Sequence, residues 1–168
     1  AFFQRMAREF KAFWTDERKA KARKAGLSQS QVATLASIVQ AEQSNHRDER
    51  PRVAGLYVNR LHKGMRLQAD PTVIYALQDF SIRRVLNVHK DVDSPYNTYR
   101  HAGLPPGPIN LPEIASLDAV LNHEQHNYLY MCAKPDFSGY HNFAKTYEQH
   151  LVNARKFQRE LNKRKIYR

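Results

Sequence analysis

LSQSQVATLASIVQAE, residues 27–42, predicts one amphipathic helix around which a core can form. Ser28 followed three residues later by Gln31 has the spacing of a capping box, which marks the start of a helix. The apolar side chains then recur every three or four residues and so share one face. This face consists of Val32, Leu35, Ile38 and Val39.

Glu42 is a carboxylate at a position where this pattern expects a core side chain. It lies seven residues after Leu35 and three after Val39, on the same face of the helix. Because apolar surroundings penalise the charged form, burial raises the pKa of a carboxyl toward neutrality. A carboxyl that is neutral near pH 7 can act as a general acid. The alternative is a helix that ends near Gln40 and leaves Glu42 in water.

Similar signals predict the other elements. A turn through residues 135–139 lies between two apolar runs and predicts a hairpin with strands at 127–133 and 140–144. Thr146 and Gln149 have the capping-box spacing at the start of a last helix. Further helices are expected at 49–63, 72–78, 81–88 and 112–122. The predicted class is α+β: one mostly helical domain with a small antiparallel sheet.

Residues 1–26 are expected to form a basic amphipathic helix, and residues 27–168 the main domain. The apolar stripe of the helix at 1–26 is expected to pack on the main domain rather than to contact a membrane surface. The stripe contains Phe2, Phe3, Met6, Phe10, Phe13 and Trp14.

Composition restricts the possible functions. The net charge of +11 over 168 residues is concentrated in 17–24 and 155–168, and such charge attracts polyanions. Solvated helix faces explain this charge equally well, and the nearly balanced centre of the chain does not suit a nucleic-acid groove, so no nucleic-acid partner is expected.

No run of about 18 apolar residues is present to span a membrane. One cysteine, Cys132, excludes an internal disulfide.

No metal or cofactor is expected. The chain has eight histidines, but His123 and His126 straddle a predicted helix end and have no evident third ligand. The sequence also contains neither a phosphate-binding glycine loop nor a nucleophile elbow.

Five motifs in order resemble the catalytic domain of the endolytic murein transglycosylases, the YceG-like family. The resemblance covers about residues 28–150 and ends with a weaker match, HNF at 141–143. The five motifs are ASIVxxE at 36–42, VAxxYxNRL at 53–61, LQxDPT at 67–72, YNTY at 96–99 and GLPPG at 103–107. Many members of the family carry a second acid where this chain has Gln40.

The resemblance implies non-hydrolytic cleavage of the MurNAc–GlcNAc bond within peptidoglycan strands, which leaves 1,6-anhydroMurNAc ends, with Glu42 as the single general acid and base. It also implies a fragment of a longer protein whose missing amino-terminal segment anchors it in the inner membrane, with this domain facing the periplasm. Partners of that full-length protein would include the cell-wall synthesis or division machinery.

The resemblance also selects candidate residues around Glu42. Those expected to bind substrate are Gln68, Asp70, Thr72, Tyr96, Asn97, Thr98, Tyr99 and His141. Those expected to support the site are Glu49, Asn59, Arg60, Pro105, Pro106 and Gly107. Each also has a structural interpretation, such as core aromatics, turn formers, helix caps or a stiff proline turn.

Two other functions remain open from the residues. A muramidase would hydrolyse the same bond with Asp70 or Glu49 as a second acid. A catalytically silent module would bind glycan or serve as a scaffold, and its Glu42 would have an ordinary pKa.

Overall fold

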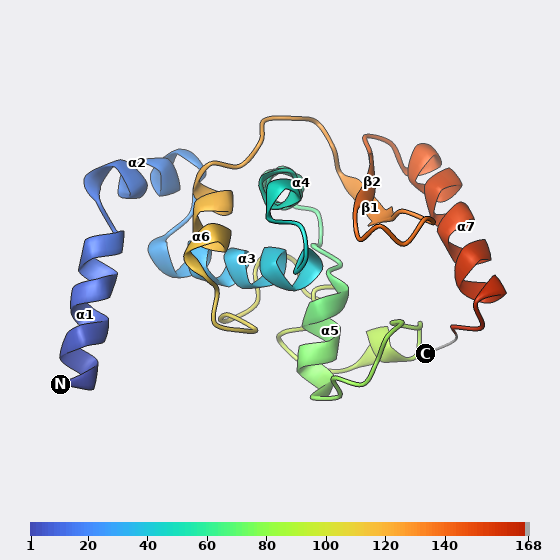
Figure 1. Cartoon of the computed structure of the whole chain (residues 1–168), viewed down its shortest axis with the longest axis horizontal. Coiled ribbons are helices and arrows are strands. Elements are labelled where there is room, and N and C mark those ends of the chain that lie inside the picture. The colour runs from blue at the N-terminus through green and yellow to red at the C-terminus, as the bar shows by residue number, and fades with distance from the viewer. Residues whose placement is uncertain (167–168) are drawn as a thin grey trace.

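Helix α3 (Gln29–Glu42) lies at the centre of the fold, with α4 (Arg50–His62), α5 (Asp70–Leu77) and α6 (Ile114–Leu121) packed against it (Figure 1). This computed structural model describes residues 1–166. The last two residues of the predicted domain and of the basic C-terminal stretch, 167–168, lie outside the described residues.

The local signals of α3 are confirmed. Ser28 Oγ accepts a bond from the Gln31 N–H at 3.2 Å, and Gln31 Oε1 accepts one from the Ser28 N–H at 2.9 Å. The helix ends at Glu42 rather than at Gln40. The four apolar residues of the predicted face are fully buried, so α3 forms the middle of the core.

A hairpin and a long helix form the other end of the molecule. Strand β1 (Tyr130–Ala133) pairs with β2 (His141–Ala144) in antiparallel register, with Tyr130 opposite Ala144. Helix α7 (Tyr147–Lys163) begins after its cap Thr146 and packs on both strands. The predicted α+β class, mostly helical with a small antiparallel sheet, is therefore confirmed.

The helix predicted at 81–88 is wrong. Turns occupy this stretch, and the next regular element is the short 3-10 helix η2 (His89–Asp91). Side chains take up the backbone N–H groups here: Asp79 accepts from the Ser81 N–H at 3.2 Å, and His89 Nδ1 accepts from the Leu86 N–H at 2.9 Å. Such local bonds compete with a helix.

The amino-terminal residues form two helices rather than one, α1 (Phe2–Phe13) and α2 (Asp16–Lys24). Thr15 is the N-cap of α2, and its side chain accepts a hydrogen bond from the Arg18 N–H. Trp14, 7 % exposed, joins the core, but no residue of α1 is buried, and the helix projects from one end of the molecule (Figure 1). The expectation that the whole stripe packs on its own domain is therefore wrong for its first part, since Phe3 is 84 % exposed.

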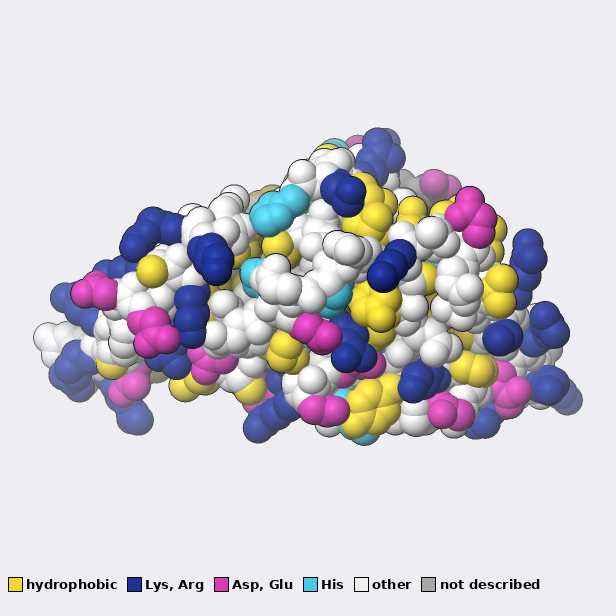
Figure 2. All heavy atoms as spheres, turned by 90° about the horizontal axis from the view of Figure 1, so that it is seen from above, with side chains coloured by type: hydrophobic (Ala, Val, Ile, Leu, Met, Phe, Trp, Pro, Cys, Tyr) yellow, Lys and Arg dark blue, Asp and Glu magenta, His cyan; other side chains and the backbone are white. Residues whose placement is uncertain are grey.

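Charge is spread over the surface. On the face shown in Figure 2, Lys and Arg side chains extend from one end to the other, with Asp and Glu among them. This face therefore carries a diffuse positive charge rather than one basic patch. No helix among residues 1–166 is both long and apolar enough to cross a bilayer.

Candidate active site

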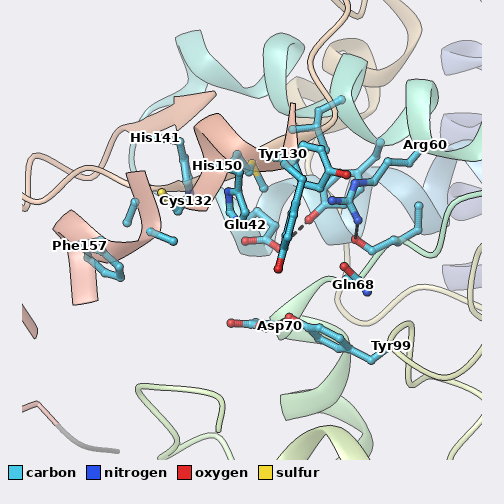
Figure 3. A pocket seen from close by; sticks show the side chains of 17 residues that line it. Glu42, Arg60, Gln68, Asp70, Tyr99, Tyr130, Cys132, His141, His150 and Phe157 are labelled. Carbon is cyan, nitrogen blue, oxygen red and sulfur yellow. Dashed lines mark hydrogen bonds between the residues drawn. The ribbon is translucent and has the colours of Figure 1, made fainter. Parts of the chain in front are cut away.

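Glu42 lies in a cleft of about 410 Å³ between the α3–α5 part of the fold and the hairpin with α7 (Figure 3). One side is formed by α4, the segment that leads into α5, and Tyr99, and it carries Arg60 and Asp70. The other side comes from β1, His141 and α7. The cleft is lined by Glu42, Leu56, Tyr57, Arg60, Leu67, Gln68, Asp70, Tyr99, Tyr130, Met131, Cys132, Ala133, His141, Tyr147, His150, Ala154 and Phe157.

The carboxyl of Glu42 has the properties of an acid–base group. It is the last residue of α3 and is partly exposed, and the Tyr57 hydroxyl donates to its Oε1 at 2.7 Å. Burial raises the pKa of Glu42 to about 7, with a further contribution from the negative charge of Asp70, while the Tyr57 bond and His141 oppose the rise. Both protonation states are therefore available near neutral pH.

Tyr57 stays a donor to this carboxyl. Burial and the neighbouring charge of Glu42 raise the pKa of Tyr57 well above its usual value. Its hydroxyl therefore remains protonated and continues to bond Oε1. No hydrogen bond to Oε2 occurs within residues 1–166, so this oxygen can exchange a proton.

Arg50 fixes the end of α3 that carries Glu42. Its side chain is 2 % exposed and donates to the carbonyl oxygens of Gln43 at 2.7 Å and Ser44 at 3.1 Å. It also pairs with Glu113 at 2.6 Å and donates to Ser116 Oγ at 3.0 Å. Gln43 is the C-cap residue of α3, so Arg50 satisfies one of the carbonyl oxygens that a helix end leaves unpaired.

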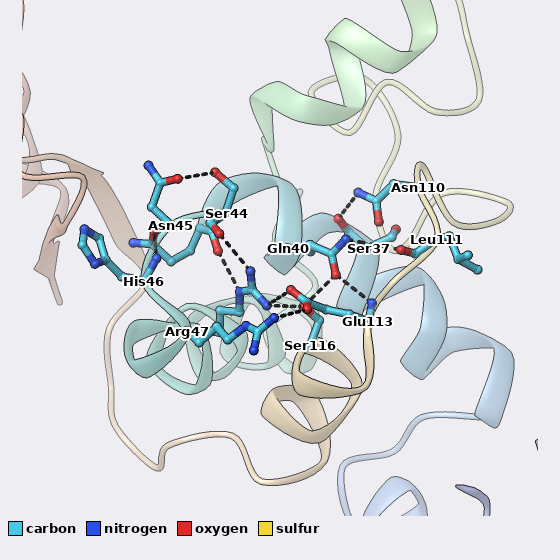
Figure 4. A network of polar contacts seen from close by, with 12 residues as sticks. Ser37, Gln40, Ser44, Asn45, His46, Arg47, Asn110, Leu111, Glu113 and Ser116 are labelled. Atoms are coloured by element: carbon cyan, nitrogen blue, oxygen red, sulfur yellow. Dashed lines mark hydrogen bonds and ion pairs between the residues drawn. The ribbon is translucent and has the colours of Figure 1, made fainter. Parts of the chain in front are cut away.

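Gln40 belongs to a network of polar contacts with Glu113 and Ser116 (Figure 4), and it does not line the cleft. Its Oε1 accepts from the Glu113 N–H at 2.8 Å and from Ser116 Oγ at 3.0 Å. Its Nε2 donates to the Leu111 carbonyl at 3.3 Å. A carboxylate could not make this last bond, so the amide suits the position and leaves Glu42 as the acid of α3 in the cleft.

Asp70 is the second carboxyl in the cleft. It begins α5 and, with Tyr99, lies across the cleft from Glu42 (Figure 3). The Tyr99 hydroxyl donates to Asp70 Oδ1 at 2.5 Å. Burial raises the pKa of Asp70, while the bond from Tyr99 and the charge of Lys90 oppose the rise.

Glu49 lies outside the cleft and holds His141, one of the residues that line it. It is 6 % exposed and does not line the cleft, and its Oε1 accepts from the His141 N–H at 2.9 Å. Its Oε2 accepts from His141 Nδ1 at 2.7 Å and also from the Gln43 amide. Burial by itself would raise the pKa of Glu49, but these bonds together lower it. Glu49 thus orients His141, which does line the cleft.

Several predicted substrate-binding residues lie beneath the cleft surface. Gln68, Asp70, Tyr99 and His141 line the cleft, whereas Thr72, Tyr96, Asn97 and Thr98 do not. Thr98 Oγ1 accepts from the Ala69 N–H at 3.0 Å and bonds Thr72 Oγ1 at 2.8 Å. The Asn97 amide donates to two backbone carbonyls, and the ring of Tyr96 packs on Tyr75. These contacts join the segments that carry Gln68, Asp70 and Tyr99.

The supporting residues are also dispersed. Arg60 lines the cleft and donates to the carbonyl oxygens of Leu129, Arg66 and Leu67. Asn59 donates to the carbonyls of His126 and Tyr128. The loop with Pro105, Pro106 and Gly107 lines a separate hollow of about 330 Å³ beside the first half of α3.

Most of the polar and aromatic cleft residues missed from the sequence come from the hairpin and α7, and Tyr57 of α4 was missed as well. Tyr130, Cys132, Tyr147, His150 and Phe157 line the cleft. Tyr147, His150, Ala154 and Phe157 follow one another at spacings of three and four, which indicates one helix face. That spacing could have identified this side of the cleft from the sequence. Within residues 1–166 no cluster of three potential metal-binding side chains occurs.

Comparison with known proteins identifies relatives of this chain. The model of the YceG-like family matches residues 1–156. Endolytic murein transglycosylases from Bacillus subtilis (strain 168) and Streptococcus pneumoniae (strain D39) are 37% identical over 139 residues and 32% identical over 111. The matched regions cover 83% and 64% of this chain, but 38% and 20% of those proteins.

A solved structure agrees with this match. The crystal structure of a yceG-like protein from Listeria monocytogenes superimposes with a TM-score of 0.72 and 39% sequence identity. The match covers 80% of this chain and 43% of that chain. The chain therefore spans less than half the length of the relatives it matches.

Replacing Glu42 with Gln is expected to stabilise the fold at pH 8 and not at pH 4. The folded pKa of about 7 lies above the unfolded value of 4.5. The folded state thus holds its proton longer, so stability is lost as pH rises from about 4.5 to about 7. The neutral amide avoids this loss, and the gain should be on the order of 1–3 kcal/mol. Urea unfolding of both proteins at the two pH values measures it; an equal gain at pH 4 would contradict the explanation.

Replacing Asp70 with Asn should lower the pKa of Glu42. The substitution removes a negative charge that disfavours the Glu42 carboxylate but leaves the burial that contributes most to the shift. Carbon-13 NMR titration of the glutamate side-chain carboxyls measures the change. Asp93→Asn is the control, since this exposed carboxylate does not line the cleft. An unchanged Glu42 pKa in Asp70→Asn would show that the two groups do not interact.

Proposed function

The chain belongs to the YceG-like family, and we propose that it is a peptidoglycan lytic transglycosylase that cuts within glycan strands. The observation that carries the proposal is the Glu42 carboxyl in the cleft, with a pKa of about 7. One such group can serve first as acid and then as base. The murein transglycosylases among its relatives support the choice of substrate.

In the first step Glu42 protonates the oxygen that links MurNAc to GlcNAc, and the bond from that oxygen to C1 of the muramic sugar breaks. Positive charge develops at C1 and the ring oxygen. In the second step the Glu42 carboxylate removes the proton from the 6-hydroxyl of the same sugar, and O6 bonds C1. The product is a 1,6-anhydro ring, water does not enter, and Glu42 ends protonated as it began.

Neighbouring groups suit both steps. Tyr57 donates to Oε1 and stabilises the carboxylate that forms between the steps. Asp70, when ionised, places negative charge in the same cleft, where it favours the protonated Glu42 and the positive charge at C1. Gln68 and Tyr99 offer hydrogen-bonding groups for the sugar hydroxyls at this side of the cleft.

The two other functions are less well supported. Hydrolysis would need a second carboxylate to activate water, but Glu49 does not line the cleft and is bonded to His141 and Gln43. Asp70 is the remaining candidate, and its Oδ1 is bonded by Tyr99. A silent module gives no reason for a Glu42 pKa near 7.

The proposal extends to the cellular setting. Peptidoglycan lies outside the plasma membrane, so we place this domain on that side, as part of a longer anchored protein that works with the cell-wall synthesis machinery. Protease digestion of intact spheroplasts that contain the full-length protein should remove the domain. Protection until the membrane is disrupted would contradict this placement.

Incubation with purified, uncross-linked glycan strands should yield anhydro-ended muropeptides, which mass spectrometry detects. Glu42→Gln should lower the rate by about 10²–10⁴-fold because it removes the general acid. In the unmutated protein, kcat/KM should fall about tenfold per unit as pH rises beyond about 7 because the acid form is lost.

Glu17→Gln is the matched control, because Glu17 is an exposed carboxyl that does not line the cleft and the variant should retain Glu42 chemistry. Reducing-end products would instead identify a hydrolase and direct attention to Asp70. The absence of any product would favour the silent module.

A further inference from the structure

One wall of the cleft is aromatic and takes no part in the proposed chemistry. It is formed by Tyr130 of β1 and by Tyr147 and His150 of α7. The Tyr130 ring lies 5.3 Å from the imidazole of His150 at an interplanar angle of 25° and 5.7 Å from the ring of Tyr147. Three rings from two elements thus form one packed group that lines the same cleft as Glu42, and Figure 3 labels Tyr130 and His150 of this group.

Tyr147 is unusually open for a large side chain in such a group. It is 54 % exposed although it lines the cleft and contacts the other two rings. An aromatic ring with an apolar face and a polar hydroxyl matches a pyranose, which also combines an apolar face with a polar rim. Ligand sites generally join such apolar surface to a few placed polar groups.

His150 supplies a polar group with unused hydrogen-bonding capacity. Its Nδ1 is buried and has no hydrogen-bond partner among residues 1–166. Leaving such an atom unpaired is costly. Because Nδ1 is buried, it can bond a ligand in the cleft only after the imidazole turns, and a turn that forms this bond gains free energy. Burial and the charge of Arg60 also lower the pKa of His150. The ring is therefore neutral at pH 7 and suits a hydroxyl or acetamide group better than a carboxylate.

We propose that Tyr147, His150 and Tyr130 form a subsite for a sugar ring of the glycan strand, next to the bond that Glu42 cuts. The assignment of the ligand rests on the proposed function, but binding at this subsite does not require cleavage. The acidic stem peptide fits less well. Arg60 is the one Lys or Arg among the described lining residues, and it is 6 % exposed and bonded to three backbone carbonyls.

The test is binding to the Glu42→Gln protein, so that no strand is cut. Calorimetry would compare peptide-free glycan oligomers of one and of four disaccharides. Adding Tyr147→Ala should weaken binding of the longer oligomer about tenfold, equivalent to about 1.4 kcal/mol, and affect the single disaccharide much less. Tyr147→Phe keeps the ring and should restore most of the affinity. His150→Phe keeps the ring but removes its nitrogens, and should cause an intermediate loss.

Phe80→Ala is the matched control, because Phe80 is a 69 % exposed aromatic that does not line the cleft. Cys132, the one cysteine of the chain, lines the same cleft and supplies a second measurement. The longer oligomer should slow its alkylation in the Glu42→Gln protein and in the Phe80→Ala control, but much less in Tyr147→Ala. Circular dichroism confirms that each variant is folded.

Equal affinity of Tyr147→Ala and Phe80→Ala for the longer oligomer would overturn the proposal, as would the absence of any glycan binding. A loss seen only with strands that carry stem peptides would assign the wall to the peptide and also overturn it. Weaker binding of peptide-free glycan by Tyr147→Ala, together with no anhydro product from the unmutated chain, would keep the subsite and reject the enzymatic proposal.

Discussion

The buried guanidinium of Arg50 determines where the cleft acid can lie. It bonds the two carbonyls that follow Glu42 and connects them to Glu113 and Ser116 at the start of α6. A charge this deeply buried is tolerated because its donors are paired, and removing its partners would leave it uncompensated. The end of α3 is thus held by bonds from α4 and α6, independently of any substrate.

Glu42 and Glu49 show how the same side chain acquires opposite properties seven residues apart. Glu49 accepts bonds from His141 and Gln43, which stabilise its charge and lower its pKa. Glu42 is bonded by the Tyr57 hydroxyl alone among the described side chains, while burial and Asp70 disfavour its charge. The first carboxylate can therefore serve as a structural anion and the second as a proton donor. The raised pKa costs stability at neutral pH, as is common where a site is built for chemistry.

Local signals in the sequence predicted the parts of the fold that depend on neighbours in the chain. The capping box of α3, the apolar face that ends at Glu42, and the hairpin at 130–144 all follow from short-range spacing. Short-range spacing does not predict the outward direction of α1, because that direction depends on where Trp14 packs. It also does not predict the turns at 81–88, which depend on single side-chain hydrogen bonds. Motifs also could not separate residues in the cleft from those beneath it. Thr98 and Tyr99 are adjacent, yet only Tyr99 lines the cleft.

The two sides of the cleft are held together through the turn that follows Glu42. Gln43 donates to the Gly139 carbonyl at 2.9 Å, and His46 donates to the Ser138 carbonyl at 2.7 Å and stacks on Tyr140. Gly139 has a φ of +86°, and a Cβ there would lie 3.0 Å from His46 Nε2, so only glycine fits this approach without strain. With the Glu49–His141 pair, these bonds fix the hairpin, and therefore the aromatic wall, to the same turn that Arg50 anchors. The acid and the aromatic wall thus share one rigid support, and such a support favours a single orientation of a bound molecule relative to the acid.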